Sequence, residues 1–235
     1  MKLLVLAGGY GTRLRSLGFD VPKALVPVGS VPFLALQIQN WIDQGINSFT
    51  FLLHHQSDQV IDFLNGAKGG LLNDCDVSSV VEPSPLGTGG AVAFAARELT
   101  LRDDFFVANA DTWLSSGLAQ LNNTPAPALA VTAVSDSGRY GKVNIDRDGK
   151  VTGFEEKSSQ GRAGSINAGL YRLNAQIFDD WDGSGFSLEK KTFPELISRG
   201  QLRSVLINSD FIDIGVPEDY QRFCRWISEG RETML

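Results

Sequence analysis

The sequence is poor in cysteine and has no long run of apolar residues. Its 235 residues include two cysteines, Cys75 and Cys224, which excludes a disulfide framework and a cysteine-based metal site. The apolar run at residues 3–7 ends at Gly8-Gly9. It is too short for a signal peptide, and a membrane span needs about 20 apolar residues. We therefore expect a cytoplasmic protein without a membrane partner.

Positive charge is also scarce. Lysine and arginine together number 21 against 27 acidic residues, which gives a net charge of −6. A protein whose main partner is a nucleic acid would favour a basic surface, so we expect no nucleic-acid partner. The apolar fraction of 43% and the charged fraction of 20% are typical of an ordinary globular protein. A chain of this length can bury a core without disulfides or zinc.

Strand and helix signals alternate along the first half of the chain. Short apolar runs at residues 3–7, 49–53, 77–81 and 105–108 read as strands, and helical patterns lie between them. This alternation predicts an α/β fold with a mainly parallel sheet and helices on both faces. After Thr124, strand-like runs dominate at residues 128–134, 141–145, 151–155 and 166–173. We expect one domain, with a nucleotide-binding half at about 1–124 and a more β-rich half at about 125–235.

A glycine-rich string follows the first predicted strand. It reads Leu-Ala-Gly-Gly-Tyr-Gly-Thr-Arg-Leu over residues 6–14, and Pro-Lys-Ala-Leu follows at 22–25. Glycines after a buried strand let backbone amides approach a phosphate, and Arg13 and Lys23 supply cations for it. A dinucleotide-binding fingerprint would need a third glycine where Leu14 stands, and no Gly-Lys-Ser/Thr of a Walker loop follows.

This string resembles the signature of sugar-1-phosphate nucleotidyltransferases, the nucleotide-diphosphosugar pyrophosphorylases. The resemblance continues through Glu-Pro-Ser-Pro-Leu-Gly-Thr-Gly-Gly-Ala at 82–91, which is similar to the family's second nucleotide loop but alone could be a turn before a helix. It implies a Rossmann-like nucleotide-diphospho-sugar transferase fold. The nucleotide-binding residues that it implies are Leu6, Ala7, Gly8, Gly9, Gly11, Thr12, Arg13, Lys23, Glu82, Pro85, Leu86, Gly87, Thr88 and Gly89.

Two carboxylates stand in segments that resemble the family's metal-binding motifs. Asn109-Ala110-Asp111 ends the fourth predicted strand, with Ala110 in place of the usual glycine. Asp213 lies in Phe-Ile-Asp-Ile-Gly-Val-Pro at 211–217, with Val216 where threonine is common. A single aspartate at a strand end is more often a cap or turn residue. Two in matched motifs fit Mg²⁺ (or Mn²⁺), since Mg²⁺ is held by few carboxylates together with substrate phosphates and water.

The second half contains segments that resemble the family's sugar-phosphate motifs. Arg-Tyr-Gly-Lys-Val at 139–143, Phe-Glu-Glu-Lys at 154–157 and Ile-Asn-Ala-Gly at 166–169 imply a sugar-phosphate site. Ser158 replaces the proline that usually follows the lysine of the second segment. Taken alone, that segment could be a solvated charge run and the third an ordinary core strand. The implied sugar-phosphate ligands are Tyr140, Gly141, Glu156, Lys157 and Asn167.

The resemblance implies an enzyme that joins a sugar 1-phosphate to a nucleoside triphosphate and releases pyrophosphate. Arg13, Lys23, Asp111 and Asp213 would be its catalytic residues. The three segments at 86–91, 154–157 and 166–169 are most similar to heptose 1-phosphate guanylyltransferases, which favours GTP as the nucleotide. Mannose-1-phosphate guanylyltransferases and uridylyl- or thymidylyltransferases are alternatives within the family, and a homodimer is compatible with it. A non-catalytic sugar-nucleotide sensor is the alternative of another class, although a sensor would not need all four catalytic residues.

Overall fold

The computed structural model describes residues 1–11, 14–155 and 162–230, which form two compact units. Unit 1 comprises residues 1–85, 109–115 and 211–235, and unit 2 comprises residues 86–108 and 116–210. Each unit is assembled from segments that lie far apart in the sequence.

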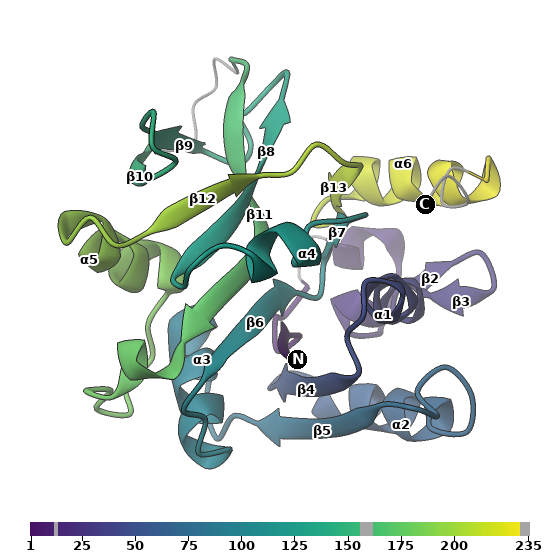
Figure 1. The fold of residues 1–235 in the computed structure, drawn as a ribbon. Helices are drawn as coiled ribbons and strands as arrows, with labels where there is room; N and C mark the ends of the chain where they lie inside the picture. Colours follow the sequence, from purple (N-terminus) through teal and green to yellow (C-terminus); the bar gives the residue numbers. More distant parts are fainter. Residues whose placement is uncertain (12–13, 156–161, 231–235) are drawn as a thin grey trace. The chain divides into compact units, whose positions relative to one another are not determined.

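Unit 1 contains a parallel three-stranded arrangement in which β4 pairs with both β1 and β5 (Figure 1). The strands β1 and β4 are apolar and buried in their middle: Leu3, Leu4 and Val5 of β1 and Phe49 and Phe51 of β4 are fully buried. Short antiparallel ladders join β2 to β3 and β7 to β13. The elements are β1 (Lys2–Leu6), β2 (Pro27–Val28), β3 (Val31–Pro32), α1 (Phe33–Asp43), β4 (Ser48–Leu53), α2 (Ser57–Ala67), β5 (Asp76–Val81), β7 (Thr112–Leu114), β13 (Phe211–Asp213) and α6 (Pro217–Ser228).

A second apolar cluster of unit 1 packs α1 and α6 against the short ladders. Phe33 of α1 meets Phe223 of α6 edge to face at 5.0 Å between ring centroids, and Trp113 of β7 lies 5.2 Å from the same ring. Ile212 and Ile214 complete the cluster from the β13 segment. Burial of these side chains stabilises the two ladders, which are too short to be stable alone.

Unit 2 contains four strands in the order β12-β8-β11-β6 (Figure 1). The β8–β12 pair is parallel, whereas β11 runs antiparallel to both of its neighbours. The hairpin β9–β10 turns through residues 146–149, as the Asp-Arg-Asp-Gly sequence predicts. The elements are α3 (Gly87–Glu98), β6 (Asp104–Asn109), α4 (Leu118–Asn122), β8 (Ala128–Val134), β9 (Lys142–Ile145), β10 (Val151–Glu155), β11 (Gly164–Asn174), α5 (Phe193–Ser198) and β12 (Arg203–Leu206).

The predicted α/β class with a mainly parallel sheet is confirmed. Within the two units, the pairs β1–β4, β4–β5 and β8–β12 are parallel, and both antiparallel pairs of the four-stranded sheet in unit 2 involve β11. None of the helices in the described ranges is long and apolar enough to cross a membrane.

Candidate active site

Three backbone hydrogen bonds hold the glycine loop where it leaves β1. The Ala7 amide donates to the Leu52 carbonyl at 3.0 Å, and the Ala110 amide donates to the Leu6 carbonyl at 3.1 Å. The His55 amide donates to the Gly8 carbonyl at 3.4 Å. These bonds fix the first residues of the predicted phosphate loop to the end of β4 and to the segment that precedes β7.

Glycine at position 8 leaves room for the close approach of two neighbours. A Cβ atom at this position would lie 3.1 Å from the His54 backbone nitrogen and 3.2 Å from Glu82 Oε1. The Glu82 amide donates to the Leu53 carbonyl at 2.8 Å, which places this buried glutamate at the carboxyl end of β5 beside the loop. Two of the predicted nucleotide-binding residues, Gly8 and Glu82, therefore lie side by side.

The predicted catalytic residues Lys23, Asp111 and Asp213 meet in unit 1. Lys23 Nζ donates to Asp111 Oδ2, and the same nitrogen lies 3.7 Å from Asp213 Oδ1. The lysine side chain is 17% exposed, while those of Asp111 and Asp213 are 36% and 30% exposed. One cation is thus shared between two half-exposed carboxylates that a ligand in solution can still reach.

The β7–β13 ladder brings the two aspartates together from distant parts of the chain. Asp213 pairs in register with Thr112, and the Ile214 amide donates to the Asp111 carbonyl at 3.0 Å. The Gly215 amide donates to Asp213 Oδ1 at 2.7 Å. A Cβ atom at Gly215 would lie 2.7 Å from that oxygen and 3.0 Å from Lys23 Nζ, so a side chain there would displace the cluster.

Two further contacts hold the segment that contains Lys23. Gly11, with φ +59°, lies so close that a Cβ atom on it would be 3.0 Å from Lys23 Cβ, which joins the glycine loop to the lysine. On the other side, the Tyr220 hydroxyl of α6 donates to the Pro27 carbonyl. Burial and the neighbouring Cys224 thiol raise the pKa of Tyr220 well above its usual range, which keeps the phenol protonated as a donor.

The cluster fits a Mg²⁺ ion that is held jointly by protein and substrate. No group of three or more histidine, cysteine, aspartate or glutamate side chains able to hold a metal occurs in the described part of the chain. Two carboxylates alone do not make an all-protein cage. They do match the Mg²⁺ preference for one or two carboxylates plus substrate phosphates and water.

Gln37 is a site residue that the sequence analysis missed. This fully buried side chain of α1 donates from Nε2 to the Thr112 carbonyl at 2.9 Å and to the Asn109 carbonyl at 3.5 Å. It therefore fixes the backbone on both sides of Asp111. In the sequence, this role could have been inferred from the position of Gln37, a polar amide on the otherwise apolar helix face formed by Phe33, Leu34 and Ile38.

The second predicted nucleotide loop passes from unit 1 at Pro85 to unit 2 at Leu86 and opens α3. Leu86 is buried, and Gly87 has φ +69°, a conformation that favours glycine. The Thr88 hydroxyl donates to Glu189 Oε2 at 2.9 Å. The single proton of the Thr88 hydroxyl is therefore donated to a residue of unit 2.

The predicted sugar-phosphate residues in the described ranges all lie in unit 2. Tyr140 and Gly141 form a turn in which both amides donate to the Ser137 carbonyl, at 2.9 and 3.1 Å. Asn167 lies on β11 where the pairing with β8 shifts register. Its amide donates to the Tyr171 hydroxyl at 3.0 Å and its Oδ1 accepts from the Gly169 amide at 2.9 Å. Thr12, Arg13, Glu156 and Lys157, also predicted as site residues, lie outside the described residues.

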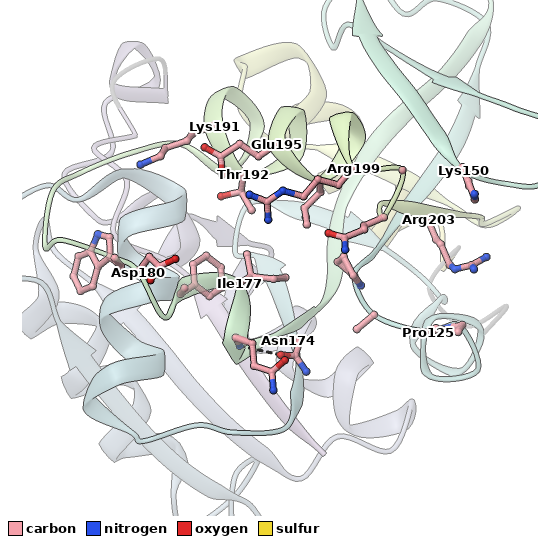
Figure 2. Close-up of a pocket in the computed structure, with 18 of the residues that line it drawn as sticks. Pro125, Lys150, Asn174, Ile177, Asp180, Lys191, Thr192, Glu195, Arg199 and Arg203 are labelled. Atoms are coloured by element: carbon pink, nitrogen blue, oxygen red, sulfur yellow. Dashed lines mark hydrogen bonds between the residues drawn. The ribbon is translucent and has the colours of Figure 1, made fainter.

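A separate pocket of about 770 Å³ in unit 2 contains none of the predicted site residues (Figure 2). Figure 2 shows charged side chains of both signs around it. Its cationic lining residues are Lys150, Lys191, Arg199 and Arg203, and its acidic ones are Asp180 and Glu195. Phe186 also lines this pocket.

Comparison with known proteins decides the family. The model of the nucleotidyl transferase family matches residues 2–228. The chain belongs to the nucleotidyl transferase family. This transferase is 33% identical over 229 residues to the D-glycero-alpha-D-manno-heptose 1-phosphate guanylyltransferase of Campylobacter jejuni, covering 95% of this chain and 98% of the relative. It is 33% identical over 228 residues to a probable mannose-1-phosphate guanylyltransferase of Oryza sativa, of which it spans only 63%.

A solved structure gives the same picture for this nucleotidyl transferase. HddC from Yersinia pseudotuberculosis superposes with a TM-score of 0.85 at 33% identity, over 96% of this chain and 99% of that one. A second structure of HddC, in complex with GMP-PN, superposes with a TM-score of 0.82 at 31% identity, over 96% of this chain and 99% of that one. The expected enzyme class, a sugar-1-phosphate nucleotidyltransferase, is confirmed at the level of the family and these relatives.

Proposed function

We propose that this transferase joins GTP to D-glycero-α-D-manno-heptose 1-phosphate to give GDP-heptose and pyrophosphate. A phosphate oxygen of the sugar attacks the α-phosphorus of GTP, the new P–O bond forms, and the α–β bond breaks as pyrophosphate leaves. The observation that carries the proposal is the meeting of Lys23, Asp111 and Asp213 beside the glycine loop. Similarity to the C. jejuni guanylyltransferase over 98% of that protein, and to HddC in complex with GMP-PN, favours heptose and guanine.

The chain needs no general base for this reaction. The second pKa of a phosphate monoester is about 6, so the attacking oxygen is already largely ionised near neutral pH. Catalysis then depends on positioning and on charge neutralisation around the phosphates. Lys23 and Arg13 hold the triphosphate and the departing pyrophosphate, and Lys157 orients the sugar phosphate.

Asp111 and Asp213 are the residues that would hold Mg²⁺, or Mn²⁺ in its place. When bound there with the nucleotide, the ion supplies neutralisation of the charge on the reacting phosphates. Gln37 supports this role through the backbone of residues 109 and 112, because it fixes the direction in which Asp111 leaves the chain.

The remaining assignments follow from the same proposal. Residues 1–124 bind the nucleotide with the loops at 6–14 and 82–89, and residues 125–235 supply Tyr140, Gly141, Glu156, Lys157 and Asn167 to the sugar phosphate. The enzyme works in the cytoplasm, where GTP is available, and its product serves bacterial surface polysaccharide. Mannose 1-phosphate is the second candidate substrate, because mannose-1-phosphate guanylyltransferases also match this chain, at 31–34% identity.

Pyrophosphate release across a matrix of substrates tests the proposal. The nucleotides are GTP, ATP, CTP, UTP and dTTP, and the sugars are the 1-phosphates of heptose, mannose and glucose. We expect the highest kcat/KM for GTP with the heptose phosphate. A preference for mannose 1-phosphate would establish the second candidate. No pyrophosphate release from any pair, with binding of a nucleotide sugar retained, would identify a non-catalytic sensor.

A further inference from the structure

The second nucleotide loop does not stand alone but is fastened along its length to the segment at 184–189. We propose that Phe186 and Glu189 are positioning residues for the nucleotide, which hold the loop Leu86–Gly90 in the conformation that receives it. This inference rests on the proposed function, because that function assigns the loop to the nucleotide. Neither residue belongs to a motif that the sequence analysis singled out.

The backbone of Phe186 makes three hydrogen bonds with the loop. Its amide donates to the Leu86 carbonyl at 2.8 Å, and its carbonyl accepts from the amides of Gly89 and Gly90 at 2.9 and 3.2 Å. The Gly89 amide lies in the first turn of α3, where no carbonyl of the helix can accept from it. The Leu86 carbonyl, four residues before Gly90, accepts from the Phe186 amide. Phe186 therefore acts as an external cap that determines where the helix begins.

The glycines of the loop are required by this packing. A Cβ atom at Gly87 would lie 2.7 Å from the Phe186 carbonyl oxygen, and one at Gly89 would lie 2.1 Å from a ring carbon of Phe186. Both distances are shorter than any real contact of a Cβ atom. The glycines of the Leu-Gly-Thr-Gly-Gly sequence are thus explained by the packing of Phe186 against the loop, independently of any ligand.

A side-chain network fastens the same loop at Thr88. The Thr88 hydroxyl donates to Glu189 Oε2 at 2.9 Å and accepts from the Leu188 amide at 2.9 Å. The Ser187 hydroxyl donates to the same glutamate oxygen at 2.6 Å. One carboxylate oxygen thus joins Thr88 of the loop to the start of the π-helical turn Leu188–Thr192. Hydrogen bonds to a charged acceptor are the stronger kind, so Glu189 is the residue whose loss should release the loop.

Few contacts hold the segment at 184–189 against the loop Leu86–Gly90. Phe186 and Lys191 line the pocket of unit 2, and the Lys191 ammonium lies 5.1 Å from the centre of the Phe186 ring. Because that side of the segment borders a cavity, its position depends on the buried Leu188 side chain and on the hydrogen bonds to Leu86, Thr88, Gly89 and Gly90. A change at Glu189 should therefore alter the loop without collapsing the fold.

The variant Glu189→Ala tests the inference with two readouts that do not require turnover. Backbone amides at 86–91 should exchange with solvent faster than in the wild type, and the dissociation constant for GTP, measured by calorimetry, should rise about tenfold, or about 1.4 kcal/mol. In turnover assays KM for GTP should rise by a similar factor, while kcat and KM for the sugar 1-phosphate stay within about twofold.

Two matched variants separate positioning from a general structural effect. Glu189→Gln keeps an oxygen that accepts from both hydroxyls, so it should restore most of the GTP affinity. Glu195→Ala removes a carboxylate from the neighbouring helix α5 at the same pocket, where we find no ion pair for it within the described residues, and it should leave both readouts unchanged (Figure 2).

The results that would overturn this inference differ from the result that would overturn the proposed function. Unchanged GTP affinity or unchanged exchange at 86–91 in Glu189→Ala overturns the inference, as does an equal rise in KM for both substrates or a Glu189→Gln variant as weak as Glu189→Ala. If the wild type binds GTP but releases no pyrophosphate, the proposed function fails. Exchange and GTP binding then still decide whether Glu189 positions the loop.

Discussion

Replacement of Lys23 by methionine should have opposite effects on metal binding and on catalysis. In the structure the Lys23 ammonium contacts Asp111 and lies 3.7 Å from Asp213 Oδ1, so its single charge offsets half of the charge of the two carboxylates that would hold the divalent cation. In the absence of nucleotide, the ammonium and the metal ion therefore compete for the same oxygens. With nucleotide bound, the lysine can turn to the phosphates and leave the carboxylates to the metal.

The size of the effect follows from Coulomb's law. Two unit charges about 4 Å apart interact by about 1 kcal/mol in water, so a divalent ion held by both carboxylates would be repelled by a remaining ammonium by about 2 kcal/mol. At about 1.4 kcal/mol per factor of ten, this corresponds to roughly thirtyfold in affinity. The side chains of Lys23, Asp111 and Asp213 are 17%, 36% and 30% exposed, so their charges are screened less than in bulk water and the value for water is the lower bound of the effect.

The assay is a titration with Mn²⁺ followed by the electron paramagnetic resonance signal of the free ion, without nucleotide. We expect Lys23→Met to bind Mn²⁺ about thirtyfold more tightly than the wild type, while its rate of pyrophosphate release falls by orders of magnitude because a cation at the transition state is lost. Lys2→Met is the matched control, since Lys2 lies 3.9 Å from Asp76, elsewhere in unit 1. Equal or weaker Mn²⁺ binding by Lys23→Met would refute the reasoning. Normal turnover in that variant would remove Lys23 from the catalytic residues.

Three other predictions concern the metal, the sugar phosphate and the loop packing. Activity should vanish in excess chelator and return with Mg²⁺ or Mn²⁺, and full activity in chelator would contradict a metal on Asp111 and Asp213. Lys157→Met should raise KM for the sugar 1-phosphate or lower kcat by roughly ten- to a hundredfold, since a charge-assisted hydrogen bond contributes about 1.5–3 kcal/mol, and GTP affinity should hold. If Lys157→Met kept the wild-type kcat and the wild-type KM for both substrates, Lys157 would belong to a solvated run of charged surface residues and would not bind the sugar phosphate. Gly89→Ala should lower the free energy of unfolding by about 1–3 kcal/mol because its Cβ would meet the Phe186 ring. Gly66→Ala, which meets nothing within 4 Å, should not destabilise the protein, and equal denaturation midpoints for the two variants would count against the packing argument.

The elements whose signal is local can be predicted from the amino-acid sequence alone. The apolar run after Met1 became β1, the proline at 194 opens α5, and the Asp-Arg-Asp-Gly turn became the β9–β10 hairpin. These features depend on hydrophobic runs, on the fixed φ of proline and on turn residues, all of which act over a few positions. The glycine loop, the two carboxylates and the family were recognisable for the same reason, because each motif is a short continuous string.

Which of these motifs come into contact depends on the tertiary fold. The strands β7 and β13 have three residues each, so neither has a sequence signal of its own, and each exists because the other lies beside it. Their pairing is what places Asp111 and Asp213 at Lys23. The start of α3 at Gly87 shows the same dependence. The Phe186 carbonyl, from nearly a hundred residues further on, accepts the amides of its first turn, and no local pattern records a partner at that distance.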